Sequence, residues 1–178
     1  DSFCNDISGD FDIKTIPVSI NLDKFSRKNP VVKKGHIGFS EEKPLFGLVA
    51  RLSPEKNIEY AISLFSKIKN SNLAIFGSGP LKTSLESILS KNKYSNIKII
   101  NHKENINDYY NIFDAFILTS KIEGTPFSIA EAMAFELPIF STDVGDIKNT
   151  FSKNNEISFL SGNIKEDTNL IRYFLKNI

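Results

Sequence analysis

The chain has 178 residues, a length that suits one domain of ordinary size. Its 22 Lys and Arg against 21 Asp and Glu give a net charge of +1, which excludes a generally basic surface built for nucleic acid or an anionic membrane. The single cysteine, Cys4, excludes a disulfide framework and a cysteine-based zinc site, and it suits a reducing compartment. No apolar run approaches the roughly 20 residues that cross a bilayer.

Two parts of the chain differ in pattern. Residues 14–20 favour a short extended segment, and residues 21–42 are polar and typical of a connector. From residue 44 onward, short apolar runs alternate with segments whose apolar residues have helical spacing. The expected strands are residues 45–50, 73–76, 97–100, 115–119, 138–141 and 157–160, and the expected helices are residues 58–68, 80–89, 106–112, 126–135 and 166–176.

This alternation with short connections predicts an α/β fold, a doubly wound, mostly parallel Rossmann-like sheet with helices on both faces. We expect the strand order 3-2-1-4-5-6. In that order the first and fourth strands are neighbours at the switch point, and ligands bind beyond their carboxyl ends. The loops that follow these two strands, residues 51–57 and 120–126, are therefore where a site is expected.

The loop after the first strand contains Arg51 and Lys56. A cation at the start of a helix opposes the helix dipole, at a cost of about 0.3–1 kcal/mol. A bound anion reverses that effect, and an arginine with a lysine can hold a diphosphate. The alternative is that Glu55 neutralises one of the two cations and both face solvent.

The loop after the fourth strand leads into an apolar helix. Gly124 permits an unusual turn, and Pro126 can begin a helix whose free amides point at the cleft. Glu131 interrupts this helix, so its carboxylate is expected to be buried and to need a partner or a ligand. The alternative is an internal salt bridge or a protonated core glutamate. Glu123 lies in the loop itself, where a carboxylate needs no special explanation.

Other candidates are weaker. The turn at residues 77–80 lacks the lysine and hydroxyl residue of a phosphate loop, so a tight turn is favoured. His36 and His102 are isolated in the sequence, which argues against a metal site. Ser120 and Ser128 have no neighbouring histidine, so a hydrolase triad is unsupported.

Taken together, residues 44–160 resemble the C-terminal, donor-binding domain of retaining glycosyltransferases of the GT-B fold, family 4, also called glycosyl transferases group 1. Four segments carry the resemblance in order: residues 16–25 match the linker motif, residues 47–57 the Gly-x-x-x-Arg-x-x-x-x-Lys-Asn motif, residues 75–80 the Gly-x-Gly-Pro turn, and residues 123–134 the motif with two glutamates. One departure is Asp146, which stands near the expected cleft where the family usually has a second glycine.

The resemblance implies a role for each motif residue. Arg51 and Lys56 would bind the diphosphate of the donor and stabilise it as a leaving group, Glu123 would contact the sugar near the reacting carbon, and Glu131 would hold the ribose. Arg51, Lys56 and Glu123 are thus the catalytic candidates. The donor-binding set is Arg51, Lys56, Gly77, Gly79, Glu123, Gly124, Thr125, Pro126, Phe127, Ser128 and Glu131. No metal and no cofactor is implied.

The resemblance also implies how the whole protein is organised. Residues 1–43 would be the end of an N-terminal half with the interdomain linker, and residues 44–178 a donor domain truncated at its C-terminus. The chain would be inactive alone, because the acceptor-binding half is missing. Its substrates would be a nucleoside-diphosphate sugar and a glycan or lipid-linked acceptor, with no nucleic acid partner. The location would be cytoplasmic, with membrane contact at the cytoplasmic face through the missing half.

Two alternatives stay open at this point. A GT-B nucleotide-sugar epimerase is disfavoured because the Arg–Lys and paired-Glu spacings match transferases better. A non-catalytic nucleotide-binding module is expected to have lost Glu123 or Lys56, and both are present. The base, the sugar, the acceptor and the oligomeric state are not specified by the sequence.

Overall fold

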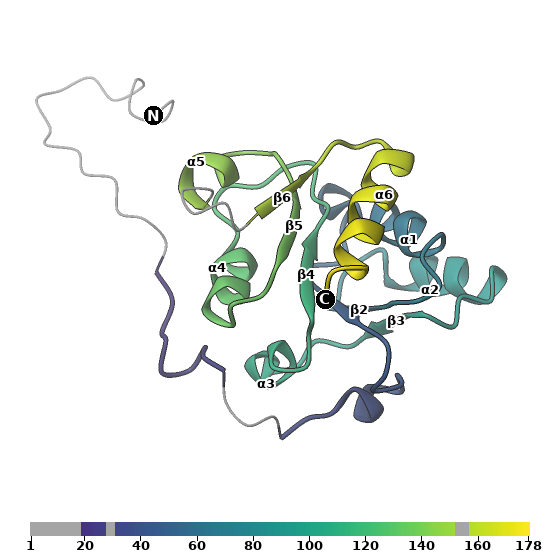
Figure 1. Ribbon diagram of the computed structural model, residues 1–178, viewed down its shortest axis with the longest axis horizontal. Coiled ribbons are helices and arrows are strands. Elements are labelled where there is room, and N and C mark those ends of the chain that lie inside the picture. Colours follow the sequence, from purple (N-terminus) through teal and green to yellow (C-terminus); the bar gives the residue numbers. More distant parts are fainter. Residues whose placement is uncertain (1–18, 28–30, 152–156) are drawn as a thin grey trace, which may run out of the picture.

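The computed structural model describes residues 19–27, 31–151 and 157–178. Within them, six strands form one parallel sheet in the order β3-β2-β1-β4-β5-β6, which confirms the predicted order (Figure 1). The strands are β1 (Leu45–Val49), β2 (Asn72–Phe76), β3 (Ile97–Ile100), β4 (Ala115–Leu118), β5 (Ile139–Thr142) and β6 (Ile157–Leu160). The central strands β1, β2 and β4 are almost entirely buried, as expected for a parallel sheet covered on both faces.

Helices cover both faces of this sheet. They are α1 (Ile58–Phe65), α2 (Lys82–Lys91), α3 (Ile106–Tyr110), α4 (Phe127–Ala134), α5 (Ile147–Phe151) and α6 (Ile164–Leu175), with short 3-10 helices η2 (Lys34–Ile37) and η3 (Pro54–Lys56). Helices α1, α2 and α6 pack on one face, and α3, α4 and α5 pack on the other (Figure 1). The strand period of two divides β1 between the faces: Phe46 and Leu48 join the first core, and Leu45 joins the second.

Some helix boundaries differ from those predicted. Helix α2 begins at Lys82, two residues after Pro80. Helix α6 begins at Ile164 because the side chain of Asn163 caps it by accepting bonds from two backbone amides. Helix α5 was not predicted, since five residues are too few to show a helical period.

The connector is anchored more firmly than its polar sequence suggested. Lys34 of η2 lies 2.6 Å from the carboxylate of Asp114, which also accepts a bond from the Leu45 amide at the start of β1. Phe39 is buried in the second core, and Phe25 packs against the same core. The predicted segment 14–20 falls mostly outside the described residues, as does Cys4.

Candidate active site

The loop after β1 presents two cations in different ways. Arg51 is exposed, and its guanidinium makes no hydrogen bond or ion pair with any residue that the structure describes. Lys56 ends η3, and Asn57 then adopts a left-handed conformation with φ 49° before α1 begins. Asparagine tolerates this conformation better than most residues, which explains the Lys-Asn pair of the motif.

Lys56 contacts Glu123 from the loop after β4. Its Nζ lies 2.8 Å from both carboxylate oxygens, and the hydroxyl of Ser120 donates to Oε1 at 2.6 Å. The side chains of Lys56 and Glu123 are 21% and 8% exposed, so the pair is largely withdrawn from water. The structure thus brings together two of the three catalytic candidates and adds Ser120 as a support that the sequence had not indicated.

Backbone contacts hold the two loops in register. The amide of Lys121 donates to the Glu55 carbonyl at 2.7 Å, and the hydroxyl of Thr119 donates to the Asn57 carbonyl at 3.1 Å. The side chain of Glu55 accepts from the Ser53 hydroxyl, which lowers the pKa of that carboxyl. In the alternative, Glu55 neutralises one of the two cations and both face solvent. Lys56 does not fit it, because it pairs with Glu123, whereas Arg51 is exposed as that alternative expects.

A hollow of about 260 Å³, here called the β1–β4 hollow, opens between these loops. It is lined by Val49, Ala50, Arg51, Lys56, Leu118, Glu123 and residues 125–128. Residues 125–128 lead into α4, which begins at Phe127 with Pro126 in the N-cap position and no side-chain cap. The positive end of the helix therefore faces the same space as Arg51 and Lys56. Gly124, between Glu123 and this turn, has open space around it.

A second hollow of about 520 Å³, here called the β1–β2 hollow, shares Arg51 with the first and is also lined by residues 77–79 and by His102. A Cβ on Gly77 would lie 1.9 Å from the carbonyl oxygen of Ala50, and one on Gly79 would lie 2.4 Å from that of Leu52. Both glycines are thus required for the close approach of two loops. His102, which the sequence did not favour as a metal ligand, also lines this hollow. No pattern in the sequence predicted that it would lie there.

Glu131 lies outside the residues that line these two hollows. It is half-buried rather than buried as predicted. Its Oε2 accepts a bond of 2.8 Å from the Tyr110 hydroxyl, so its hydrogen-bond partner is a neutral donor rather than the cation of a salt bridge. Burial raises the pKa of Glu131, while the Tyr110 hydroxyl and the charge of Lys24 oppose that rise. Burial and the neighbouring Glu131 carboxylate raise the pKa of Tyr110 well above its ordinary value.

The turn after β5 packs against the loop that contains Glu123. A Cβ on Gly145 would lie 2.1 Å from the carbonyl oxygen of Glu123, so this glycine lets the two turns touch. Asp146 accepts side-chain bonds from Asn149 and Thr150, both at 2.9 Å, at the start of α5. These bonds lower the pKa of Asp146 and give the unusual residue a structural role.

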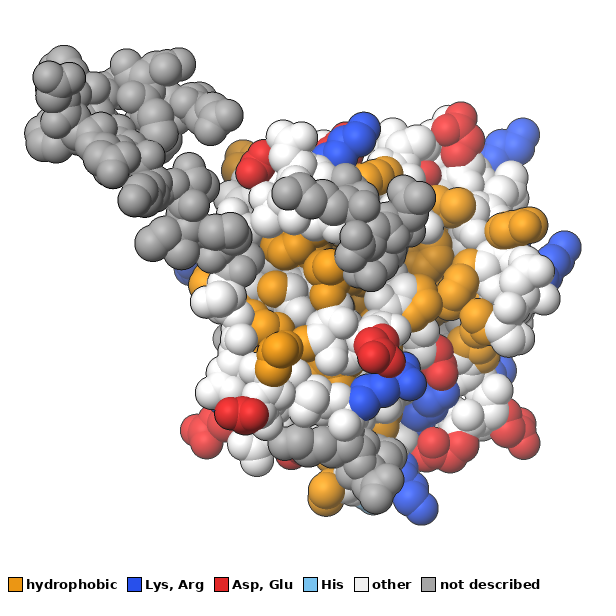
Figure 2. All heavy atoms as spheres, turned by 60° about the vertical axis from the view of Figure 1, so that its left-hand side comes forward, with side chains coloured by type: hydrophobic (Ala, Val, Ile, Leu, Met, Phe, Trp, Pro, Cys, Tyr) orange, Lys and Arg blue, Asp and Glu red, His pale blue; other side chains and the backbone are white. Residues whose placement is uncertain are grey.

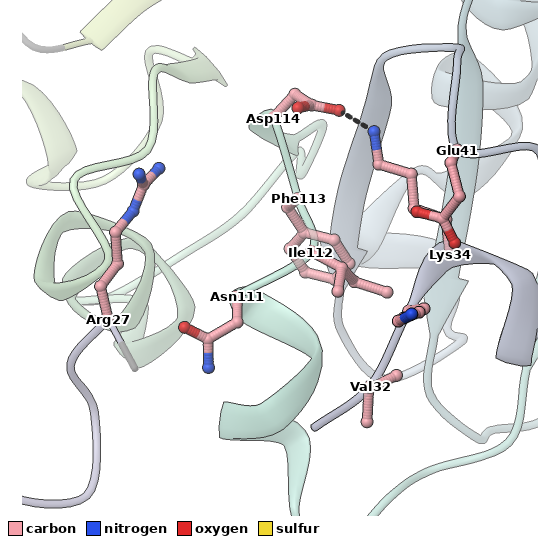
Figure 3. A pocket seen from close by; sticks show the side chains of 9 residues that line it. Arg27, Val32, Lys34, Glu41, Asn111, Ile112, Phe113 and Asp114 are labelled. Carbon is pink, nitrogen blue, oxygen red and sulfur yellow. Dashed lines mark hydrogen bonds and ion pairs between the residues drawn. The ribbon is translucent and has the colours of Figure 1, made fainter. Parts of the chain in front are cut away.

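A hollow of about 380 Å³ lies away from these loops, where the chain enters β4 (Figure 3). Lys34 and Asp114 face each other there, and Arg27 lies on the side of α4. The Nε of Arg27 donates to the Phe135 carbonyl at 2.9 Å. The charged side chains that pair there are thus used to fasten the connector, and none of the predicted site residues lines this hollow.

Two further observations concern the described residues as a whole. They contain no group of three or more His, Cys, Asp and Glu side chains arranged to hold a metal, and none of their helices is long and apolar enough to span a membrane. On the face drawn in Figure 2, hydrophobic side chains gather at the centre, and a group of basic and acidic side chains lies directly beside them.

Comparison with known proteins identifies the family. Residues 32–177 match the family model described as glycosyl transferases group 1. The chain therefore belongs to the glycosyl transferases group 1 family. The predicted membership of glycosyl transferases group 1 and the predicted Rossmann-like half of a GT-B fold are both confirmed.

Individual relatives agree with this assignment. The chain is 30% identical over 190 residues to the alpha-monoglucosyldiacylglycerol synthase of Acholeplasma laidlawii, covering 95% of this chain and 47% of that protein. It is 29% identical over 150 residues to a protein named as the teichuronic acid biosynthesis glycosyltransferase TuaC of Bacillus subtilis, covering 83% of this chain and 37% of that one. Among solved structures, the sucrose-phosphate synthase of Thermosynechococcus elongatus superposes with a TM-score of 0.79 at 19% identity, covering 90% of this chain and 43% of that one. The chain spans less than half the length of these proteins.

Proposed function

We propose that this chain is the donor-binding half of a retaining, metal-independent family 4 glycosyltransferase that uses a nucleoside-diphosphate sugar. The observation that carries the proposal is the convergence of Arg51, Lys56 and the uncapped start of α4 on the β1–β4 hollow. Three positive features around one small space favour an anion with more than one charge.

The two cations have distinct roles in this proposal. Arg51 has no partner among the described residues, so its planar guanidinium is free to hold two phosphate oxygens at once. Lys56 would act as a point charge beside it. When the bond between sugar and diphosphate breaks, both cations would stabilise the negative charge on the leaving diphosphate, which is the work a divalent metal does in other enzymes.

The pair of Lys56 and Glu123 suggests an exchange of partners on binding. A diphosphate in the β1–β4 hollow would attract Lys56 and weaken its bond to Glu123. The carboxylate, still held by Ser120, would then be available to the sugar of the donor. In this proposal Glu123 would lie at the sugar end of the site, which is the role that the resemblance implies.

The nucleoside has two parts that need contacts, the base and the ribose that joins it to the diphosphate. The β1–β2 hollow, with Gly77, Gly79 and His102, is continuous with Arg51 and would take the base. Glu131 would accept hydroxyl protons of the ribose. The backbone N–H groups of Thr125, Phe127 and Ser128 would donate to the phosphates, since Pro126 has no such donor.

The acceptor and the location are proposed from the relatives alone. Their names mention a monoglucosyldiacylglycerol and the biosynthesis of teichuronic acid, so a glycan or lipid-linked acceptor is proposed here. The proposed location is the cytoplasm, at the membrane face. Because the chain spans less than half of those proteins, we expect it to be inactive without an acceptor-binding half. The epimerase and binding-module alternatives have no observation in their favour.

Thermal protection tests the proposal. The chain would be melted with UDP, GDP or ADP, each compared with its nucleoside, in the presence of a chelator. We expect one diphosphate to raise the melting temperature far more than its nucleoside does, because binding to the native state stabilises it. If no diphosphate raises the melting temperature, the proposed function is wrong.

A further inference from the structure

Tyr110 is held rigidly at the centre of an aromatic cluster. Its ring stacks on Phe135 and Phe116, with centroids 5.3 and 5.9 Å away, and Phe113 meets it edge-on at 5.5 Å. Phe25 of the connector closes a further side at 6.5 Å. The side chain of Tyr110 is fully buried. Because close packing fixes the ring, it also fixes the position of the hydroxyl.

The hydroxyl of Tyr110 links α3 to α4. It donates to Oε2 of Glu131 at 2.8 Å and lies 3.4 Å from the carbonyl oxygen of Ser128. The other carboxylate oxygen, Oε1, accepts no hydrogen bond from any residue that the structure describes. Glu131 thus has one oxygen fixed by a rigid donor and one oxygen available to a ligand.

We propose that Tyr110 is a positioning residue, which orients Glu131 so that Oε1 can accept a ribose hydroxyl of the nucleotide. The inference rests on the proposed function, in which Glu131 holds the ribose. A half-buried carboxylate without this donor would turn toward solvent and away from the ligand, since only hydrogen bonds to fixed groups compensate its burial.

The charged state of Glu131 depends on the same contact. Among the described residues, the groups that favour its ionised form are the Tyr110 hydroxyl on α3 and the Lys24 ammonium of the connector. Removing the Tyr110 hydroxyl therefore raises the pKa of Glu131. An ionised carboxylate is the stronger acceptor for a ribose hydroxyl. As the pH is lowered, the Tyr110→Phe variant would therefore lose nucleotide binding at a higher pH than the wild type does.

The neighbouring tyrosine provides a matched control. Tyr109 lies on the same helix and packs its ring on Phe76 at 4.8 Å. Its hydroxyl makes no hydrogen bond within the described part of the chain. Tyr109→Phe and Tyr110→Phe thus remove the same atom from adjacent residues, and both keep the aromatic ring that the core requires.

The test is calorimetric titration of the whole chain with whichever of UDP, GDP and ADP binds most tightly. We expect Tyr110→Phe to weaken binding about 3- to 10-fold and to shift the acid limb of the binding profile to higher pH, while Tyr109→Phe changes neither. In a Glu131→Ala background, Tyr110→Phe should have no further effect, because the hydroxyl acts through that carboxylate.

Each contrary result has a distinct meaning. If the wild type binds a nucleotide and Tyr110→Phe binds it equally well, the positioning role is overturned and the proposed function stands. The same conclusion follows if Tyr110→Phe weakens binding as much in the Glu131→Ala background as in the wild type. If the wild type binds none of the three nucleotides, the proposed function and this inference both fall.

Discussion

Lys56 Nζ lies 2.8 Å from both carboxylate oxygens of Glu123, and this ion pair links the side chains of the loops that follow the two central strands β1 and β4. The residues are 67 positions apart in sequence. Their pairing keeps the charge of Lys56 compensated until a stronger anion competes for it. The contact therefore brings together the cation proposed to bind the diphosphate and the carboxylate proposed to contact the sugar.

The first prediction concerns Lys56 itself. Lys56→Ala should weaken nucleoside-diphosphate binding by about 1–3 kcal/mol, the range for hydrogen bonds to charged groups. Part of the loss comes from Glu123, whose charge would then face the diphosphate without compensation. Calorimetry gives the affinity, and Lys121→Ala is the control, since Lys121 is exposed in the loop that contains Glu123. Equal affinities for the two variants would remove Lys56 from the site.

Glu123→Gln should have the opposite effect on a nucleoside diphosphate that lacks a sugar. The change removes a negative charge from the β1–β4 hollow and frees Lys56 from its partner. For a partly exposed ion pair we expect a gain of about 0.5–1 kcal/mol, or about 2- to 5-fold tighter binding by calorimetry. Weaker binding would show that Glu123 contacts the nucleotide itself, contrary to its proposed place at the sugar end.

Glu131 predicts a pH dependence of stability. Burial raises its pKa in the folded chain above the ordinary value of about 4.3, so the folded state binds this proton more tightly than the unfolded state does. The resulting stabilisation is complete below the ordinary pKa and is lost as pH rises through the folded pKa. Glu131→Gln abolishes this loss. In urea unfolding, the stability of the variant relative to the wild type should therefore increase with pH from about 4 upward and then level off. A relative stability that falls as pH rises would contradict the assignment.

Two glycines of the predicted donor-binding set should differ sharply in what they tolerate. Gly77→Ala places a Cβ against the Ala50 carbonyl and should destabilise the fold by more than about 2 kcal/mol. Gly124→Ala meets nothing within 4 Å and should change stability by less than about 0.5 kcal/mol. Chemical denaturation measures both. A small cost at Gly77 would mean that the two loops do not approach as closely as described.

The sheet and the two central loops were predictable because parallel strands, buried on both faces, leave continuous apolar runs in the sequence. The order of the strands then located Arg51, Lys56 and Glu123 at one edge. Partners could not be predicted in the same way. The bond between Tyr110 and Glu131 depends on the packing of α3 against α4, which no local pattern encodes. The same is true of His102, which follows β3 and lines the β1–β2 hollow together with Arg51.

The central claim is that Arg51 and Lys56 hold a diphosphate without a metal. The most direct test is one calorimetric titration of the wild-type chain with the tightest-binding nucleoside diphosphate, performed once with a chelator and once with excess Mg²⁺. The account predicts the same dissociation constant in both, because Arg51, Lys56 and the start of α4 supply the charge that a metal would otherwise provide. Binding that appears with Mg²⁺ and vanishes with the chelator would contradict it.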